Sequence, residues 1–213
     1  VICSGQARAG PWCADFGNNL MTRILILNAS PRRSGNIAHM AGTLKQEAER
    51  LGAEVEEIWV QGLTVRPCTG CMACRSRHAC VLPEDDAQRV LEKIKAADAL
   101  AVAAPCYWGN MPGTLKLLLD RLVYGLMDEN SLGLPLPLHK GKRCVLMSTS
   151  TTPWPFNILL HQSHGAIRAM KEVCKYSGFK IVATIEKGGT KGKKGLPERV
   201  LRRCRKAAGR LVR

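Results

Sequence analysis

The chain has 213 residues, the length of one ordinary globular domain. Hydrophobic residues make up 46% of it and charged residues 23%, a balance that excludes a disordered or collagen-like chain. No apolar run approaches the roughly 18 residues that a membrane-spanning helix needs. Lysine and arginine outnumber aspartate and glutamate by 32 to 17, which gives a net charge of +15.

Ten cysteines are spread along the chain, a number that would indicate a disulfide framework in a short secreted protein. A chain of this length has core enough to fold without one, and residues 1–20 lack the apolar stretch of a secretory signal. We therefore expect a reducing, cytoplasmic location. Met21 directly precedes the first strand-like run. Residues 1–20 are expected to be a disordered or non-native extension, and residues 21–213 the folded domain.

Strand-like and helix-like patterns alternate five times after Met21. Strands are predicted over residues 23–28, 53–60, 99–104, 144–147 and 180–185. Helices are predicted over residues 36–51, 83–94, 112–122, 161–177 and 196–211. The glycine- and proline-rich stretches 125–141 and 188–195 are expected to be surface loops. This alternation favours an α/β fold, a doubly wound sheet of five parallel strands with helices on both faces.

Ligands of such sheets bind beyond the carboxyl ends of the strands. The first of these ends, residues 28–36, has the chemistry of a phosphate site. Hydroxyl and amide side chains can donate hydrogen bonds, a glycine lets the backbone approach, arginine adds charge, and the next helix begins with free N–H groups. An ordinary N-capping turn uses the same residue types, so this loop alone leaves both readings open. The residues concerned are Ser30, Arg32, Arg33, Ser34, Gly35 and Asn36.

Two further strand ends favour a flat heteroaromatic ligand. Residues 105–113 place Tyr107 and Trp108 side by side, next to glycine and the start of a helix. Residues 148–154 supply five hydroxyl side chains and the indole of Trp154. A phosphate cradle and an aromatic slot on one edge of one sheet together predict a site for flavin mononucleotide (FMN).

The combination of loops resembles the flavodoxin-like NAD(P)H-dependent FMN reductases. The resemblance rests on Ser-Pro-Arg-x-x-Gly-Asn after the first strand, on Ala-Pro-x-Tyr-Trp-Gly-Asn-Met-Pro-Gly after the third, and on the Leu-Lys…Asp-Arg that follows. It implies the strand order 2-1-3-4-5, bound FMN and hydride transfer from NAD(P)H to a small acceptor such as a quinone, flavin, azo or nitro compound. It also implies a homodimer or homotetramer. The chain departs from the family at Ile37, where relatives often carry a hydroxyl residue.

The resemblance assigns the cofactor contacts by position. The residues assigned to the phosphate are Ser30, Arg32, Ser34, Gly35 and Asn36. The residues assigned to the isoalloxazine ring are Pro105, Cys106, Tyr107, Trp108, Gly109 and Asn110. Those assigned to the ribityl side are Ser148, Thr149, Ser150 and Thr151. Because the flavin carries the chemistry, no side chain is assigned as a catalytic acid or base. The choice between NADH and NADPH stays open.

Four cysteines, Cys68, Cys71, Cys74 and Cys80, form a C-x2-C-x2-C-x5-C run between the second strand and the next helix. Four thiolates in such a run suit a [4Fe–4S] cluster, whereas structural zinc normally uses two separated pairs of ligands. The run resembles the cluster motif of the iron–sulfur flavoproteins, which would make the chain an electron carrier. Flavin reductases can also carry a similar loop with no known cluster, so simple reduced thiols are the other reading.

Two features have a structural reading beside a functional one. Cys106 in the ring-lining loop is interpreted as a small apolar filler rather than as a redox-active thiol. From Lys187 to Arg213 the chain has eleven basic residues and one acidic residue, Glu198. Such a segment can bind nucleic acid or an anionic surface. No aromatic residue interleaves with the charges, so a solvated helix face is favoured and nucleic acid is not expected as a partner.

Overall fold

The computed structural model describes residues 21–77, 79–192 and 195–212. The extension expected at residues 1–20 lies outside this part of the chain. Among the described residues, no helix is both long enough and apolar enough to cross a membrane.

Five parallel strands form the central sheet in the order β2-β1-β3-β6-β7. Numbered among themselves, these strands have the predicted order 2-1-3-4-5, which confirms the doubly wound α/β fold. The inner strands β1, β3 and β6 are almost wholly buried, as their apolar sequences require. Their bounds are β1 Arg23–Asn28, β2 Glu54–Trp59, β3 Ala99–Pro105, β6 Arg143–Thr149 and β7 Lys180–Lys187.

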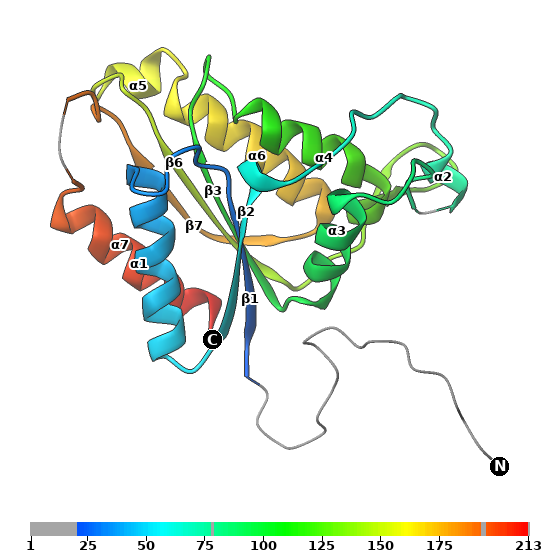
Figure 1. Cartoon of the computed structure of the whole chain (residues 1–213), viewed down its shortest axis with the longest axis horizontal. Coiled ribbons are helices and arrows are strands. Elements are labelled where there is room, and N and C mark those ends of the chain that lie inside the picture. The colour runs from blue at the N-terminus through cyan, green and yellow to red at the C-terminus, as the bar shows by residue number, and fades with distance from the viewer. Residues whose placement is uncertain (1–20, 78, 193–194, 213) are drawn as a thin grey trace.

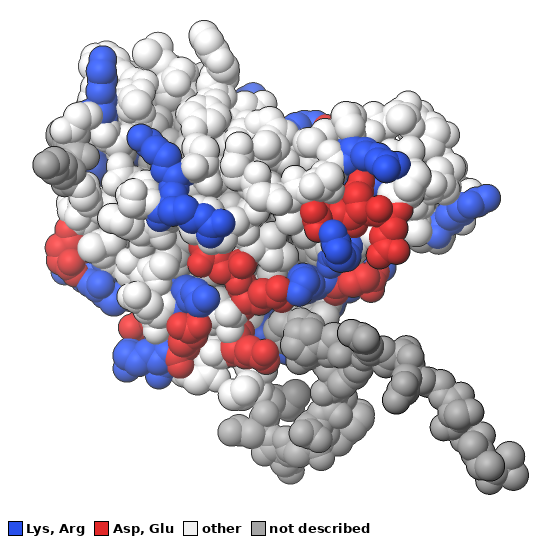
Figure 2. Space-filling view, viewed as in Figure 1, with Lys and Arg blue, Asp and Glu red and all other residues white. Residues whose placement is uncertain are grey.

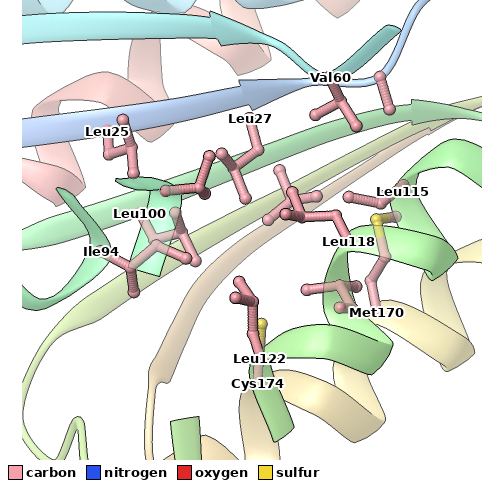
Figure 3. Close-up of a cluster of buried hydrophobic side chains, with 14 of the residues drawn as sticks. Leu25, Leu27, Val60, Ile94, Leu100, Leu115, Leu118, Leu122, Met170 and Cys174 are labelled. Carbon is pink, nitrogen blue, oxygen red and sulfur yellow. The ribbon is translucent and has the colours of Figure 1, made fainter. Parts of the chain in front are cut away.

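Helices cover both faces of this sheet (Figure 1). Successive strand residues point to opposite faces, so each inner strand contributes to two cores. Leu25, Leu27 and Leu100 face α3, α4 and α6, where they meet leucines such as Leu118 and Leu122 (Figure 3). The alternate strand residues pack against α1 and α7. The helices are α1 Asn36–Arg50, α3 Asp86–Ala96, α4 Gly113–Leu126, α6 Ser163–Ser177 and α7 Glu198–Leu211.

Residues 127–138 lie at the surface as predicted, but the prediction of an irregular loop over residues 125–141 was wrong. The helix α4 runs through the buried Gly125 to Leu126, and the short strands β4 Met127–Glu129 and β5 Pro135–Pro137 then pair as an antiparallel hairpin. Two prolines sit in β5, which has a single partner strand, where prolines are tolerated. The sequence patterns did not predict three short helical segments, which are η1 Val60–Gly62, α2 Cys74–Arg77 and α5 Phe156–Leu159.

The basic helix α7 is part of the folded domain. Its apolar residues, among them Val200, Cys204 and Leu211, are buried against the sheet. Two of its arginines reach the backbone of the edge strand β7: Arg203 donates to the Thr184 carbonyl at 2.9 Å, and Arg210 donates to the Val182 carbonyl at 2.8 Å. These contacts cover an edge that would otherwise expose unpaired backbone groups.

A buried histidine predicts how stability depends on pH. His139 stacks on Phe179 with ring centroids 5.1 Å apart, and its Nε2–H donates to the Gly125 carbonyl at 3.2 Å. Burial lowers the pKa of His139 despite this hydrogen bond, and Lys142 and Lys95 act in the same direction as burial. The unfolded chain takes up a proton at the ordinary pKa of about 6.5, whereas the folded protein does so only at lower pH.

The free energy of unfolding is therefore expected to fall as the pH drops through about 6.5. Urea unfolding of the protein and of a His139→Gln variant between pH 8 and pH 5 checks this. The difference in slope between the two proteins below pH 7 is the contribution of His139. Equal pH dependence of the free energy of unfolding in the two proteins would contradict a contribution from His139.

Candidate functional site

The three candidate loops meet at one edge of the sheet. They follow β1, β3 and β6, which are adjacent strands. Backbone hydrogen bonds link them in sequence: Ala29 N–H donates to the Ala103 carbonyl at 2.8 Å, and Cys106 N–H donates to the Thr149 carbonyl at 2.8 Å. Because these strands are parallel and adjacent, their carboxyl ends lie at the same edge of the sheet, which is where ligands of such sheets bind.

The loop between β1 and α1 forms a small cradle closed by Ser30. The hydroxyl of the buried Ser30 donates to the Arg32 carbonyl at 2.9 Å and accepts from the Arg32 N–H at 3.2 Å. Gly35 is the N-cap of α1, and a Cβ added there would lie 3.4 Å from the Ser30 hydroxyl. Among the described residues no side chain caps α1, so its first-turn N–H groups can bind an anion.

Positive charge gathers at this end of α1. Arg32, Arg33 and Ser34 are exposed, and Asn36 is partly exposed at the start of the helix. The Arg33 guanidinium lies 4.1 Å from the centre of the Trp59 ring, a cation–π contact. Figure 2 shows basic atoms near the upper end of α1, with the acidic atoms of this face further from it. The local field therefore favours a negatively charged group.

The loop after β3 is a tight turn that presents its aromatic residues. Tyr107 and Asn110 exchange two backbone hydrogen bonds of 2.9 Å each. Trp108 and Gly109 between them have φ of 53° and 69°, the geometry of a type I′ turn. Trp108 is completely exposed at its tip, with Tyr107 half-exposed beside it. Within the described residues, these two aromatics therefore form one wall rather than a closed slot.

The turn rests directly on the start of α6. A Cβ added at Gly165 would lie 2.0 Å from the Gly109 carbonyl oxygen, and one at Gly109 would lie 3.0 Å from the His161 carbonyl oxygen. Glycine at position 165 is therefore what allows this close approach. The sequence analysis did not single out Gly165, because nothing in the local pattern of a helix shows which turn will contact it.

Hydroxyl groups are buried where β6 ends. Ser148, Thr149 and Ser150 are buried, and Thr151 is exposed. The hydroxyl oxygen of Ser148 has no hydrogen-bond partner among the described residues, although it is shielded from water. Buried polar groups are normally paired, so this orphan indicates that a ligand completes the site.

A buried polar network beside this edge was missed by the sequence analysis. Asn157 donates to the Ser163 hydroxyl at 2.9 Å, and Ser163 donates to a Glu186 oxygen at 3.2 Å. The other oxygen of Glu186 lies 3.5 Å from Nδ1 of His164. The network ties α5, α6 and the end of β7 together behind the turn of residues 107–110. Its two hydrogen bonds join residues 6 and 23 positions apart in the sequence, so no local motif predicts it.

The residues at this edge fit FMN. The uncapped α1 and the cradle at Gly35 suit a phosphate. The buried hydroxyl of Ser148 lacks a polar partner among the described residues, and the loop of the intervening strand presents the exposed rings of Tyr107 and Trp108. A family model described as NADPH-dependent FMN reductase matches residues 22–169. The chain belongs to this family. The family inferred from the loops is thereby confirmed, and FMN and NAD(P)H are the cofactors on which NADPH-dependent FMN reductases depend.

Several curated relatives of this chain are named iron–sulfur flavoproteins. An "Iron-sulfur flavoprotein" from Methanosarcina thermophila is 39% identical over 101 residues, or 47% of this chain and 52% of that protein. Another from Archaeoglobus fulgidus is 34% identical over 99 residues, or 46% of this chain and 48% of that protein. The chain spans about half the length of the curated relatives it matches.

Solved structures share the FMN reductase fold at low sequence identity. An FMN-dependent NADH-azoreductase from Bacillus anthracis, in complex with FMN, matches with a TM-score of 0.70 and 19% identity over 91% of this chain and 100% of that chain. An NAD(P)H:quinone oxidoreductase from Methanothermobacter marburgensis matches with a TM-score of 0.70 and 21% identity over 91% of this chain and 97% of that chain. At this identity the likeness supports the fold alone.

The four loop cysteines of this chain line one cavity of about 300 Å³. Cys68 and Cys71 are exposed, and Cys74 and Cys80 are half-buried. Burial raises the pKa of the Cys74 thiol, and the nearby Cys80, Cys68 and Cys71 raise it further. In the described ranges, no three ligating side chains converge closely enough to hold a single metal ion. The ligands of a cluster need not converge on one ion, because each of its metal ions is held by a separate thiolate.

Cys106 is half-buried at the base of the turn of residues 107–110. Burial raises the pKa of its thiol, although the backbone N–H groups of Gly109 and Asn110 oppose that effect. A thiol kept protonated is a poor nucleophile, which agrees with the interpretation of Cys106 as a filler.

Proposed function

We propose that this protein is an FMN-dependent oxidoreductase that takes hydride from NAD(P)H and reduces a small acceptor, such as a quinone, free flavin, azo or nitro compound. The observation that carries the proposal is the meeting of three loops at one sheet edge, with an uncapped helix start, an orphan buried hydroxyl and an aromatic wall. Membership of the FMN reductase family supports the same conclusion.

Each loop has one task in this proposal. The phosphate of FMN is held by Ser30, Arg32, Ser34, Gly35 and Asn36. The ring is lined by residues 105–110, and the ribityl side by residues 148–151. Within the ring-lining turn, both backbone groups of Asn110 are used by Tyr107, so they shape the turn rather than contact the ligand.

FMN, when bound, would supply the hydride acceptor and the two-electron chemistry, so the side chains have only to bind, orient and exclude water. The turn of residues 107–110 orients the ring because its own hydrogen bonds and the contact with Gly165 hold it in place. Water is excluded poorly on one side, where Trp108, Trp154, Phe156 and Leu159 are all more than half exposed.

A second copy of the chain is the proposed cover for these exposed side chains. Large apolar groups clustered on a surface mark an interaction site. The arrangement we propose is a homodimer or homotetramer with the flavin near the subunit interface. Light scattering coupled to gel filtration checks the assembly state.

A second candidate function, an iron–sulfur flavoprotein, is favoured by the four cysteines around one cavity. Cys68, Cys71, Cys74 and Cys80 would hold a [4Fe–4S] cluster as four thiolates. Such a cluster supplies single-electron transfer, and the protein would then deliver electrons one at a time to a partner. The names of the curated relatives support this candidate.

The visible spectrum of protein purified without air tests both candidates. Iron and acid-labile sulfide are assayed on the same sample. Two flavin bands without iron would support the simple reductase. Flavin bands on a broad shoulder, with about four irons per chain, would support the electron carrier. A colourless protein that fails to take up added FMN would contradict both.

A further inference from the structure

Arg121 of α4 is buried beside the cavity of the four cysteines. Its side chain is 0% exposed, which is exceptional because arginine is almost never fully buried unless it is paired. Its partner is Asp85, itself 6% exposed, at 2.7 Å from Nη1. Nη1 also donates to the Arg66 carbonyl at 2.8 Å. The guanidinium is thus held in one orientation.

These contacts clamp the two ends of the cysteine loop together. Arg66 precedes Cys68, and Asp85 follows Cys80. The Arg66 N–H donates to Asp85 at 3.0 Å, so the ends of the loop also touch each other directly. Burial opposes the negative charge of Asp85, but hydrogen bonds from the Arg66 and Ala87 backbones and from Arg121 hold its pKa below the ordinary value. The clamp therefore joins a carboxylate to a guanidinium.

The clamp leaves two donor nitrogens of Arg121, Nε and Nη2, for the cavity. Nε–H donates to the sulfur of Cys80 at 3.2 Å. Nη2 is buried and has no hydrogen-bond partner among the described residues. An unpaired buried donor of a charged group is costly, so a ligand with acceptor atoms is expected next to it. Arg121 and all four cysteines line the same cavity, and sulfur is the acceptor that a cluster would bring there.

Arg75 provides a natural contrast at the same cavity. It is a second arginine in the lining, half-exposed, with its guanidinium bound to Glu129 at 3.0 Å and to the hydroxyl of Tyr124 at 2.6 Å. In the part of the chain that the structure describes, no hydrogen bond joins Arg75 to a cysteine sulfur. The two arginines therefore share charge and location but differ in the contact with sulfur.

We propose that Arg121 is a positioning residue of the four-cysteine centre, which holds the cysteine loop closed and raises the reduction potential of a cluster bound there through its hydrogen bond to Cys80. This inference rests on the second proposed function. Hydrogen bonds to the sulfurs of a cluster set its potential. A donor stabilises the electron-rich reduced cluster more than the oxidised one, so its loss is expected to lower the potential.

Paired lysine variants test the proposal. Arg121→Lys keeps the positive charge but loses the Nε–H donor to the Cys80 sulfur. Arg75→Lys also keeps the charge, and it removes no hydrogen bond to sulfur. Iron content and the FMN spectrum are measured for each protein, and the cluster is titrated electrochemically under EPR. For Arg121→Lys, the ratio of reduced to oxidised cluster at the wild-type midpoint is expected to fall by about tenfold. For Arg75→Lys it is expected to stay at the wild-type value.

Each result decides a different point. Equal potentials for Arg121→Lys and the wild type, both with four irons, would overturn the role of Arg121 and leave the iron–sulfur flavoprotein intact. Wild-type protein that binds FMN but no iron would overturn both together. Should Arg121→Lys fail to fold, the Arg75→Lys protein, labelled with ¹⁵N in its arginine guanidinium groups, answers the question. Pulsed EPR of its reduced cluster is expected to detect a coupled arginine nitrogen, and its absence would contradict the proposal.

Discussion

Replacing Ser34 by glutamate is expected to weaken FMN binding by about 30-fold, or about 2 kcal/mol. Ser34 is exposed directly before the N-cap Gly35 of the uncapped helix α1. A carboxylate there lies against the position proposed for the FMN phosphate, and like charges a few ångströms apart repel. Solvent screens the repulsion because the loop is exposed, so the expected loss of FMN affinity is well below that for a buried pair of charges.

The same substitution is not expected to destabilise the fold. A negative charge at the start of a helix interacts favourably with the helix dipole, so the free energy of unfolding should stay level or rise slightly. Ser34→Gln is the matched control, because it has nearly the same shape without the charge. Fluorescence titration of the three apoproteins with FMN gives the affinities. Equal affinity of Ser34→Glu and Ser34→Gln would remove this loop from the phosphate site.

Replacing Gly165 by alanine is expected to displace the turn of residues 107–110 and to destabilise the protein by about 1–3 kcal/mol. The added Cβ would lie 2.0 Å from the Gly109 carbonyl oxygen. The obstacle is backbone, which cannot turn aside as a flexible side chain can. The turn must move, and with it the aromatic wall, so FMN affinity and the free energy of unfolding should fall together.

Gly113→Ala is the control for this experiment. Gly113 begins α4 at the other end of the same loop, and a Cβ added there meets nothing within 4 Å. Alanine is a better helix former than glycine, so this variant should be neutral or slightly more stable. Urea unfolding and FMN titration of both variants check the difference. A stable Gly165→Ala variant with unchanged FMN affinity would show that the turn does not depend on this contact.

Local sequence patterns predicted most of the elements because they record burial directly. The continuous apolar runs of β1, β3 and β6 come from burial on both faces, and the periodicities of α1 and α6 come from burial on one. The hairpin of β4 and β5 escaped detection, because its strands are three residues long and two of the three residues in β5 are prolines. The strand order came from the family resemblance, since a strand does not encode its neighbours.

For the candidate site, the sequence by itself determined the chemical groups: the hydroxyls and glycine after β1, the aromatics after β3, the hydroxyls after β6 and the four cysteines. Only the tertiary structure decided which of them meet. Arg121 lies 36 residues from Asp85 and 55 from Arg66, and Gly165 is far along the chain from Gly109. The physical reason is that such contacts depend on how the helices pack on the sheet. Packing brings together residues from distant parts of the chain, and no regular spacing in the sequence marks them.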